Sequence, residues 1–144
     1  MTELKGEARE VALAETEAVL VHARRPDVER LVFEIEAGAV DRGEELLESV
    51  LELGLHTGRI RARYGPGGEQ AALATLRKLP RGRVRTESAQ DVSQALGALA
   101  GKQLDAVRIA AVAPGAFTVS IEAEGLEASV RLDALGARIV SVAT

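Results

Sequence analysis

The stretch VRIAAVAPGAFTVSIEAEGLEASVRLDALGARIV, residues 107–140, decides the fold class of this 144-residue chain. Apolar side chains alternate with others along much of it, and the short segments APGA, EAEGLE and DALGAR interrupt the alternation. Such a period of two, broken by glycine-containing turns, is typical of β-strands joined as hairpins. We therefore expect an antiparallel meander of three or four strands, whose apolar positions are Val107, Ile109 and Ala111, then Phe117, Val119 and Ile121, then Val130 and Leu132, and finally Ile139 and Val140.

A helix is expected directly before the meander, over residues 88–102 (SAQDVSQALGALAGK). Ser88 suits the N-cap position, Asp91 suits the first turn, and Gly101 suits the C-terminal end. The apolar residues between these signals recur at helical spacing: Val92, Ala95, Leu96 and Leu99.

The N-terminal segments are harder to assign. Residues 28–38 (VERLVFEIEAG) alternate cleanly, which predicts a half-buried strand with Leu31, Phe33 and Ile35 on one face. Residues 6–23 have a helix-friendly composition but also alternate in part, so both helix and strand remain open for them. A hairpin of residues 15–23 with residues 29–37 is the preferred interpretation.

The middle of the chain predicts a β-α-β unit. Asp41 suits the N-cap of a helix whose leucines recur at helical spacing and which ends at Gly54 or Gly58. Residues 59–64 (RIRARY) alternate like a strand, and a strand that follows a crossover helix should lie parallel to the strand before it.

Residues 65–68 (GPGG) predict a tight turn in which Gly67 or Gly68 has a positive φ, since Pro66 suits the preceding turn position. Residues 69–80 then predict a short helix that ends at Pro80, and residues 81–85 a loop or a short strand.

Together these segments predict an α+β fold: a β-α-β unit followed by helices and a C-terminal antiparallel β-meander, with the helices packed on one face of the sheet or sheets. Residues 1–144 are expected to form a single domain, with a possible subdivision near residues 80–88.

Two short stretches resemble known families in the rhythm of their elements. Residues 33–64 (FEIEAGAVDRGEELLESVLELGLHTGRIRARY) resemble small ferredoxin-like or ACT-like regulatory domains. The C-terminal helix and meander, closing with RLDALGARIV (131–140), resemble a PepSY domain. Neither resemblance implies a role for any particular residue.

The composition excludes several classes of site. The chain has no cysteine, which excludes disulfides, thiolate metal ligands and cysteine nucleophiles. Its only aromatic residues are Phe33, Tyr64 and Phe117, too few for a platform on which bases stack. Its N-terminus carries charges where a signal peptide would be apolar, and no run approaches the ~20 apolar residues of a membrane span. We expect a cytoplasmic protein without a membrane segment and without a cofactor.

Positive charge is concentrated in the middle of an acidic chain. The whole chain has a net charge of −4, but residues 58–85 hold eight basic residues and one acidic residue. If residues 59–64 were a strand, its arginines could pair with Glu34 and Glu36 on a neighbouring strand. Alternatively, the segment binds an anion or polyanion, or it contacts another subunit. The candidate residues for anion binding are Arg59, Arg61, Arg63, Gly67, Gly68, Arg77, Lys78, Arg81, Arg83 and Arg85.

Candidates for catalysis are few. The two histidines, His22 and His56, lack the spacing of a metal-binding motif, and no serine lies in a nucleophile-elbow motif. We therefore expect a small non-enzymatic binding or adaptor protein that acts through protein–protein contacts and forms homo-oligomers. The alternatives are a protein that binds an anionic ligand or nucleic acid through residues 59–85, and an enzyme that uses His56 with a carboxylate.

Overall fold

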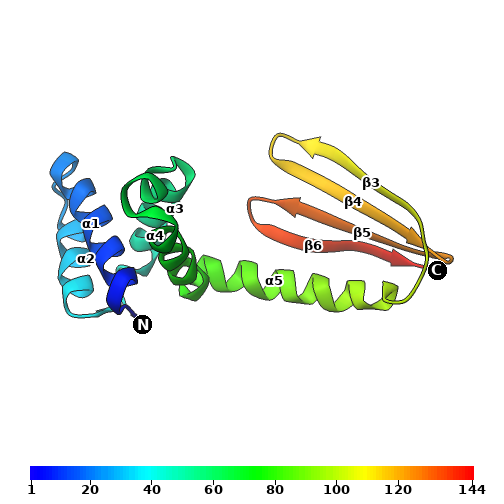
Figure 1. Ribbon diagram of the computed structural model, residues 1–144, viewed down its shortest axis with the longest axis horizontal. Helices are drawn as coiled ribbons and strands as arrows, with labels where there is room; N and C mark the ends of the chain where they lie inside the picture. The colour runs from blue at the N-terminus through cyan, green and yellow to red at the C-terminus, as the bar shows by residue number, and fades with distance from the viewer. The chain divides into compact units, whose positions relative to one another are not determined.

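The computed structural model describes all 144 residues (Figure 1). The chain divides into two compact units, Met1–Arg83 and Val84–Thr144. The boundary falls within residues 80–88, where the sequence suggested a subdivision. It lies inside the helix α5 (Pro80–Leu96), which therefore contributes residues to both units.

The first unit is helical. A two-residue strand β1 (Thr2–Glu3) pairs antiparallel with β2 (Ala39–Val40). The other elements are α1 (Gly6–His22), α2 (Pro26–Glu36), α3 (Glu44–His56) and α4 (Arg59–Lys78). These helices pack on one another around a core of Leu4, Val11, Ala12, Leu31, Ile35, Val40, Leu47, Leu51, Ile60, Ala72 and Leu79.

The predicted strand over residues 28–38 is wrong, because these residues form α2. Its buried residues are Val28, Leu31 and Ile35, which recur at the three- and four-residue spacing of one helix face. Phe33 should share the buried strand face with Leu31 and Ile35, but its exposed fraction is 71%. The hairpin of residues 15–23 with residues 29–37 is therefore also wrong, and the open segment 6–23 is helical.

The predicted strand over residues 59–64 is wrong as well, since these residues form the first turns of α4. Gly58, in the left-handed region with φ 74°, separates α3 from α4. The helix expected after Asp41 is confirmed as α3, but the predicted N-cap at Asp41 is wrong, because Gly43 occupies that position. Because the segments on both sides of α3 are helices, the chain has no β-α-β unit, and the ferredoxin-like rhythm of residues 33–64 does not correspond to strands.

The expected turn at residues 65–68 is a kink inside α4. Gly65 has φ 71° and ψ −172°, and Pro66 follows it. The predicted positive φ at Gly67 or Gly68 is wrong, since neither glycine has one. Gly68 serves close packing instead: a Cβ there would lie 2.3 Å from the Cβ of Tyr64. The helix expected over residues 69–80 is confirmed as the second part of α4, which ends at Lys78.

The predicted loop or short strand over residues 81–85 is wrong, because α5 already begins at Pro80. The helix predicted over residues 88–102 is confirmed in part as the rest of α5 and the 3₁₀ helix η1 (Gly97–Leu99). Ser88 lies inside α5, where its hydroxyl donates a hydrogen bond to the carbonyl oxygen of Arg85 rather than capping a helix.

The second unit holds the expected meander, and four strands are confirmed. They are β3 (Leu104–Ala113), β4 (Ala116–Ala123), β5 (Leu126–Asp133) and β6 (Gly136–Ala143). They pair antiparallel in the order β3-β4-β5-β6. The α+β class with a C-terminal meander is thus confirmed, whereas α1 to α4 surround a core of their own rather than forming one layer on a sheet.

Candidate functional site

The arginines of residues 59–63 lie on a helix and have separate partners. The Nε of Arg59 lies 3.5 Å from an Oε of Glu15, and an Nη of Arg61 lies 3.6 Å from an Oε of Glu69. The guanidinium of Arg63 lies 5.8 Å from the ring centroid of Tyr64. Carboxylates within the chain therefore pair with Arg59 and Arg61, but they belong to other residues than the predicted Glu34 and Glu36.

Glu34 has a different role from the predicted one. Its carboxylate accepts hydrogen bonds from the backbone N–H groups of Asp41 at 2.8 Å and Gly43 at 3.1 Å, and so holds the segment that leads into α3. The predicted ladder of Glu34 and Glu36 beside Arg59, Arg61 and Arg63 is wrong, because it required two neighbouring strands that do not form.

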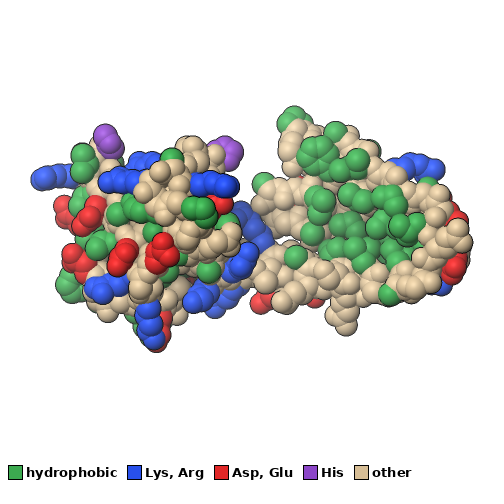
Figure 2. Space-filling view, viewed as in Figure 1, with side chains coloured by type: hydrophobic (Ala, Val, Ile, Leu, Met, Phe, Trp, Pro, Cys, Tyr) green, Lys and Arg blue, Asp and Glu red, His purple; other side chains and the backbone are tan.

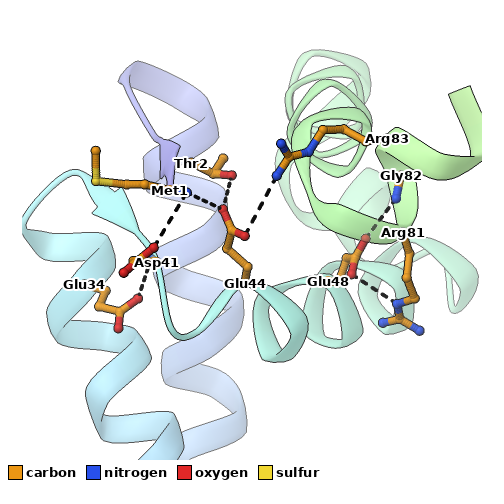
Figure 3. A network of polar contacts seen from close by, with 9 residues as sticks. All are labelled: Met1, Thr2, Glu34, Asp41, Glu44, Glu48, Arg81, Gly82 and Arg83. Atoms are coloured by element: carbon orange, nitrogen blue, oxygen red, sulfur yellow. Dashed lines mark hydrogen bonds and ion pairs between the residues drawn. The ribbon is translucent and has the colours of Figure 1, made fainter. Parts of the chain in front are cut away.

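Two further arginines of the basic segment belong to a polar network around α3, shown in Figure 3. The Nε of Arg81 lies 3.1 Å from the carboxylate of Glu48, and an Nη of Arg83 lies 4.0 Å from the carboxylate of Glu44. Glu44 also lies 3.3 Å from the N-terminal ammonium group and accepts a hydrogen bond of 2.6 Å from the hydroxyl of Thr2. This network ties the start of α5 and the N-terminus to α3.

The remaining candidates for anion binding are dispersed. Arg77 and Lys78 occupy the last turn of α4, where cations suit the negative end of the helix dipole. Gly67 lies near Glu7, because a Cβ on Gly67 would lie 3.2 Å from a carboxylate oxygen of that residue. Arg85 lies on α5 beside Gly136, in the second unit. The candidate set therefore spans several helix faces, and Gly67 borders a carboxylate, which disfavours an anion there.

The C-terminal sheet has one face without a charged or hydrogen-bonding side chain. The pairing register aligns three rungs of four residues each on it. We call this the apolar face, and its residues are Val107, Ile121, Ala128 and Val142, then Ile109, Val119, Val130 and Ile139, then Ala111, Phe117, Leu132 and Ala137. Figure 2 shows hydrophobic side chains gathered over these strands.

Much of the apolar face is open. Ala128 and Val130, in the middle of the sheet, are buried. Ile109 has an exposed fraction of 67% and Phe117 one of 42%, and Val107, Leu132 and Val142 are exposed as well. Large exposed side chains that share one face mark an interaction surface more often than scattered ones do.

The helix α5 covers only part of the apolar face. Its partly or fully buried side chains recur along one side, at Arg85, Ser88, Val92 and Leu96. A Cβ on Gly136 would lie 2.8 Å from the hydroxyl of Ser88, so α5 approaches the sheet at the start of β6, the strand beside which it runs in Figure 1. The residues of β3 remain exposed or partly exposed along the whole strand.

The opposite face of the sheet carries paired polar groups. Arg108 lies 3.1 Å from the carboxylate of Glu122, and the hydroxyls of Ser120 and Ser129 lie 3.2 Å apart. Asp133 accepts hydrogen bonds from Arg131 and Arg138. Both guanidinium groups, together with the backbone N–H of Leu135, lower the pKa of this carboxyl, with the N–H making the largest contribution. We call this side the polar face.

The two histidines lie at helix ends, and His22 lines a hollow together with Arg59 and Arg63. His22 and His56 are exposed in the last turns of α1 and α3. No group of three or more His, Asp or Glu side chains is arranged to hold a metal ion. None of the helices combines the length and the apolar character that crossing a membrane requires.

The apolar positions of the meander were evident in the sequence, but their exposure was not, since alternation identifies a face without showing what covers it. Comparisons of the chain with protein-family models, curated proteins and solved structures find no match, so what the protein does is inferred from its own residues.

Proposed function

We propose that the protein is a small cytoplasmic, non-enzymatic binding or adaptor protein, and that a second copy of the chain docks on its apolar face. The observation that supports this proposal is the set of three rungs without a polar side chain, on which five large residues are exposed. Leaving these side chains in water is unfavourable in proportion to their apolar area, so a partner that covers them is stabilised.

The apolar face has the size that a stable contact needs. Four strands at a spacing of ~4.8 Å span roughly 19 Å, and eight residues at a rise of ~3.3 Å span roughly 26 Å. Because α5 covers part of the face, two such faces would together bury at most about 1,000 Å², which is near the lower limit for a specific protein interface. Because it lacks charged groups, such a contact resembles those of permanent dimers in composition, whereas its area is closer to that of transient complexes.

The chemistry of the sheet favours a second copy as the occupant. A two-fold contact brings the same patch of both subunits together. The apolar face is complementary to itself because it contains no charged side chain that would be repelled by the same side chain of the second copy. Paired sheets pack ~10 Å apart with their apolar side chains interdigitated. The charges of the polar face neutralise one another within the chain, so docking on the apolar face leaves no charge without a partner.

Two neighbouring residues of β3 provide the test. Ile109 lies on the apolar face and Ala110 lies on the polar face of the same exposed strand. Sedimentation velocity at micromolar concentration should show a dimer for the wild type and for Ala110→Glu, but a monomer for Ile109→Glu. A wild type that remains a monomer throughout this range, or an Ile109→Glu variant that dimerises like the wild type, would contradict the proposal.

The alternatives named from the sequence have weaker support. Anion or nucleic-acid binding through residues 59–85 would have to compete with the carboxylates that Arg61, Arg81 and Arg83 already contact. A reaction that uses His56 would need a carboxylate placed beside it, and no contact of that kind supports such a role.

A further inference from the structure

A hollow between α1, α3 and α4 in the first unit has a volume of about 310 Å³. Glu15 and Arg59 line it together with the apolar side chains of Val19, Val50 and Leu53. Arg59 also lines a second hollow of about 490 Å³, to which Arg63 contributes. A small space of this kind, mostly apolar with a few polar groups, has the character of a site for a small molecule.

One residue that lines this hollow, Glu15, has a buried carboxylate oxygen without a hydrogen-bond partner in the protein. The side chain of Glu15 is only 3% exposed, and its Oε1 makes no hydrogen bond. The hydroxyl of Tyr64 is likewise buried without a partner. Nearly all buried polar side-chain atoms in proteins are hydrogen-bonded, so the unpaired Oε1 of Glu15 requires an explanation.

We propose that this hollow binds a small zwitterion, an α-amino acid with an aliphatic side chain. Its ammonium group would donate a hydrogen bond to the carboxylate of Glu15. Its carboxylate would pair with the guanidinium of Arg59, and its side chain would lie against Val19, Val50 and Leu53.

The charges of the hollow favour a zwitterion over a simple ion. Glu15 would repel an anion placed beside it, and Arg59 would repel a cation. The Nε of Arg59 lies 3.5 Å from Glu15, so the two opposite charges are adjacent, as the ammonium and carboxylate of an α-amino acid are. The hollow is close to the lower limit of ligand sites in size, which excludes bulky ligands such as nucleotides.

The only tyrosine gives a direct measurement of binding. Because the chain has one tyrosine and no tryptophan, its fluorescence excited at the tyrosine band reports Tyr64 alone. Titration of the full chain with L-leucine should change this fluorescence with saturation at or below the millimolar range. L-Leucinamide, which lacks the carboxylate, and 4-methylpentanoate, which lacks the ammonium group, should bind at least tenfold more weakly.

Variants test the position of the site. Glu15→Gln should weaken L-leucine binding at least tenfold, whereas Glu10→Gln, on an exposed position of the same helix, should leave it unchanged. Leu53 is an exposed residue at the edge of the hollow, so Leu53→Phe should fold normally and still reduce the affinity measured by calorimetry. This second variant tests the site even if Glu15→Gln fails to fold.

Two outcomes would overturn the inference. The first is the absence of saturable binding of L-leucine to the folded wild-type chain, in which case solvent satisfies Glu15 and Tyr64. The second is binding that persists unchanged in the folded variants, which would place it elsewhere. Neither outcome bears on the contact through the apolar face, because that face lies in the other unit.

Discussion

The carboxylate of Glu48 accepts a hydrogen bond from the backbone N–H of Gly82, at a distance of 3.0 Å, across 34 positions of the sequence (Figure 3). Glu48 lies in α3 and is fully buried, and Gly82 lies in the first turn of α5. Carboxylates suit this position because the first N–H groups of a helix have no partner within it. The contact fixes where α5 begins relative to α3.

Gly82→Ala should destabilise the protein by roughly 2 kcal/mol, because overpacking a tight contact strains the backbone. A Cβ on Gly82 would lie 1.6 Å from the carbonyl oxygen of Leu76, which no side-chain movement relieves. Urea unfolding followed by circular dichroism measures the difference. Gly97→Ala is the matched control, because a Cβ on Gly97 meets nothing within 4 Å. If both variants unfold at the same urea concentration, the packing around Gly82 is not as described.

Glu48→Gln should cost about 2 kcal/mol, and more than Arg81→Gln does. The first change weakens two hydrogen bonds of a buried acceptor, whereas Arg81 keeps about half of its surface in water, where an ion pair contributes little. A hydrogen bond to Glu48 raises the pKa of Arg81, so its guanidinium stays charged throughout the accessible pH range. Thermal unfolding of the two variants under the same conditions shows which is less stable. If Arg81→Gln is the less stable variant, the role assigned to Glu48 is wrong.

Tyr64 should make stability fall at alkaline pH. Burial, and then repulsion by Glu15, raise the pKa of Tyr64 above its ordinary value of about 10, so the unfolded chain loses the phenolic proton first. Stability is therefore fully present below pH ~10 and decreases as the pH rises through the folded pKa. Ultraviolet titration follows this one phenol without interference, and a midpoint at or below 10 in the folded protein would refute the assignment. Tyr64→Phe should reduce the alkaline decrease and should not destabilise the protein at neutral pH, because the hydroxyl lacks a partner.

Asp133 should contribute stability that is lost in acid. The pKa of Asp133 is lowered by the N–H of Leu135 and by Arg138 and Arg131, so its contribution is present above its unfolded pKa near 4 and declines as the pH falls through the lower folded value. Asp133→Asn should therefore destabilise the β5–β6 hairpin at neutral pH, and the difference from the wild type should disappear as the pH falls toward 2. A difference that is the same at both pH values would show that charge is not the cause.

The sequence predicted the second unit much better than the first. In the meander, glycine-containing turns separate segments in which apolar and polar residues alternate. The strands predicted from this alternation are the strands that form. In residues 28–38, alternation competed with a helical spacing that the same residues also contain: Val28, Leu31 and Ile35 fit a helix, and the helix won because packing against α1 and α3 buries those three positions. Short apolar segments remain ambiguous between the two periods.

The partners of the basic residues 59–85 could not be predicted from the sequence either. Arginines at alternate positions suggested one strand face, but in a helix residue 61 projects away from the face that residues 59 and 63 share. Arg59 pairs with Glu15 and Arg81 pairs with the buried Glu48, each partner lying dozens of positions away, and no local pattern identifies such a pair. The exposure of the apolar face also could not be predicted, because it depends on how much of the sheet α5 covers.

The central claim, that two copies meet through their apolar faces, is tested most directly by a distance between spin labels. The chain has no cysteine, so Ala110→Cys gives a single labelling position on the polar face of β3. If the apolar faces meet, the labels point away from each other across two layers, and pulsed electron paramagnetic resonance should show one intermolecular distance well above the ~10 Å between packed sheets. Two results would contradict the account. One is the absence of any intermolecular dipolar signal at concentrations where the protein sediments as a dimer. The other is strong line broadening, which labels in close contact would show if the two copies paired along their β3 edges.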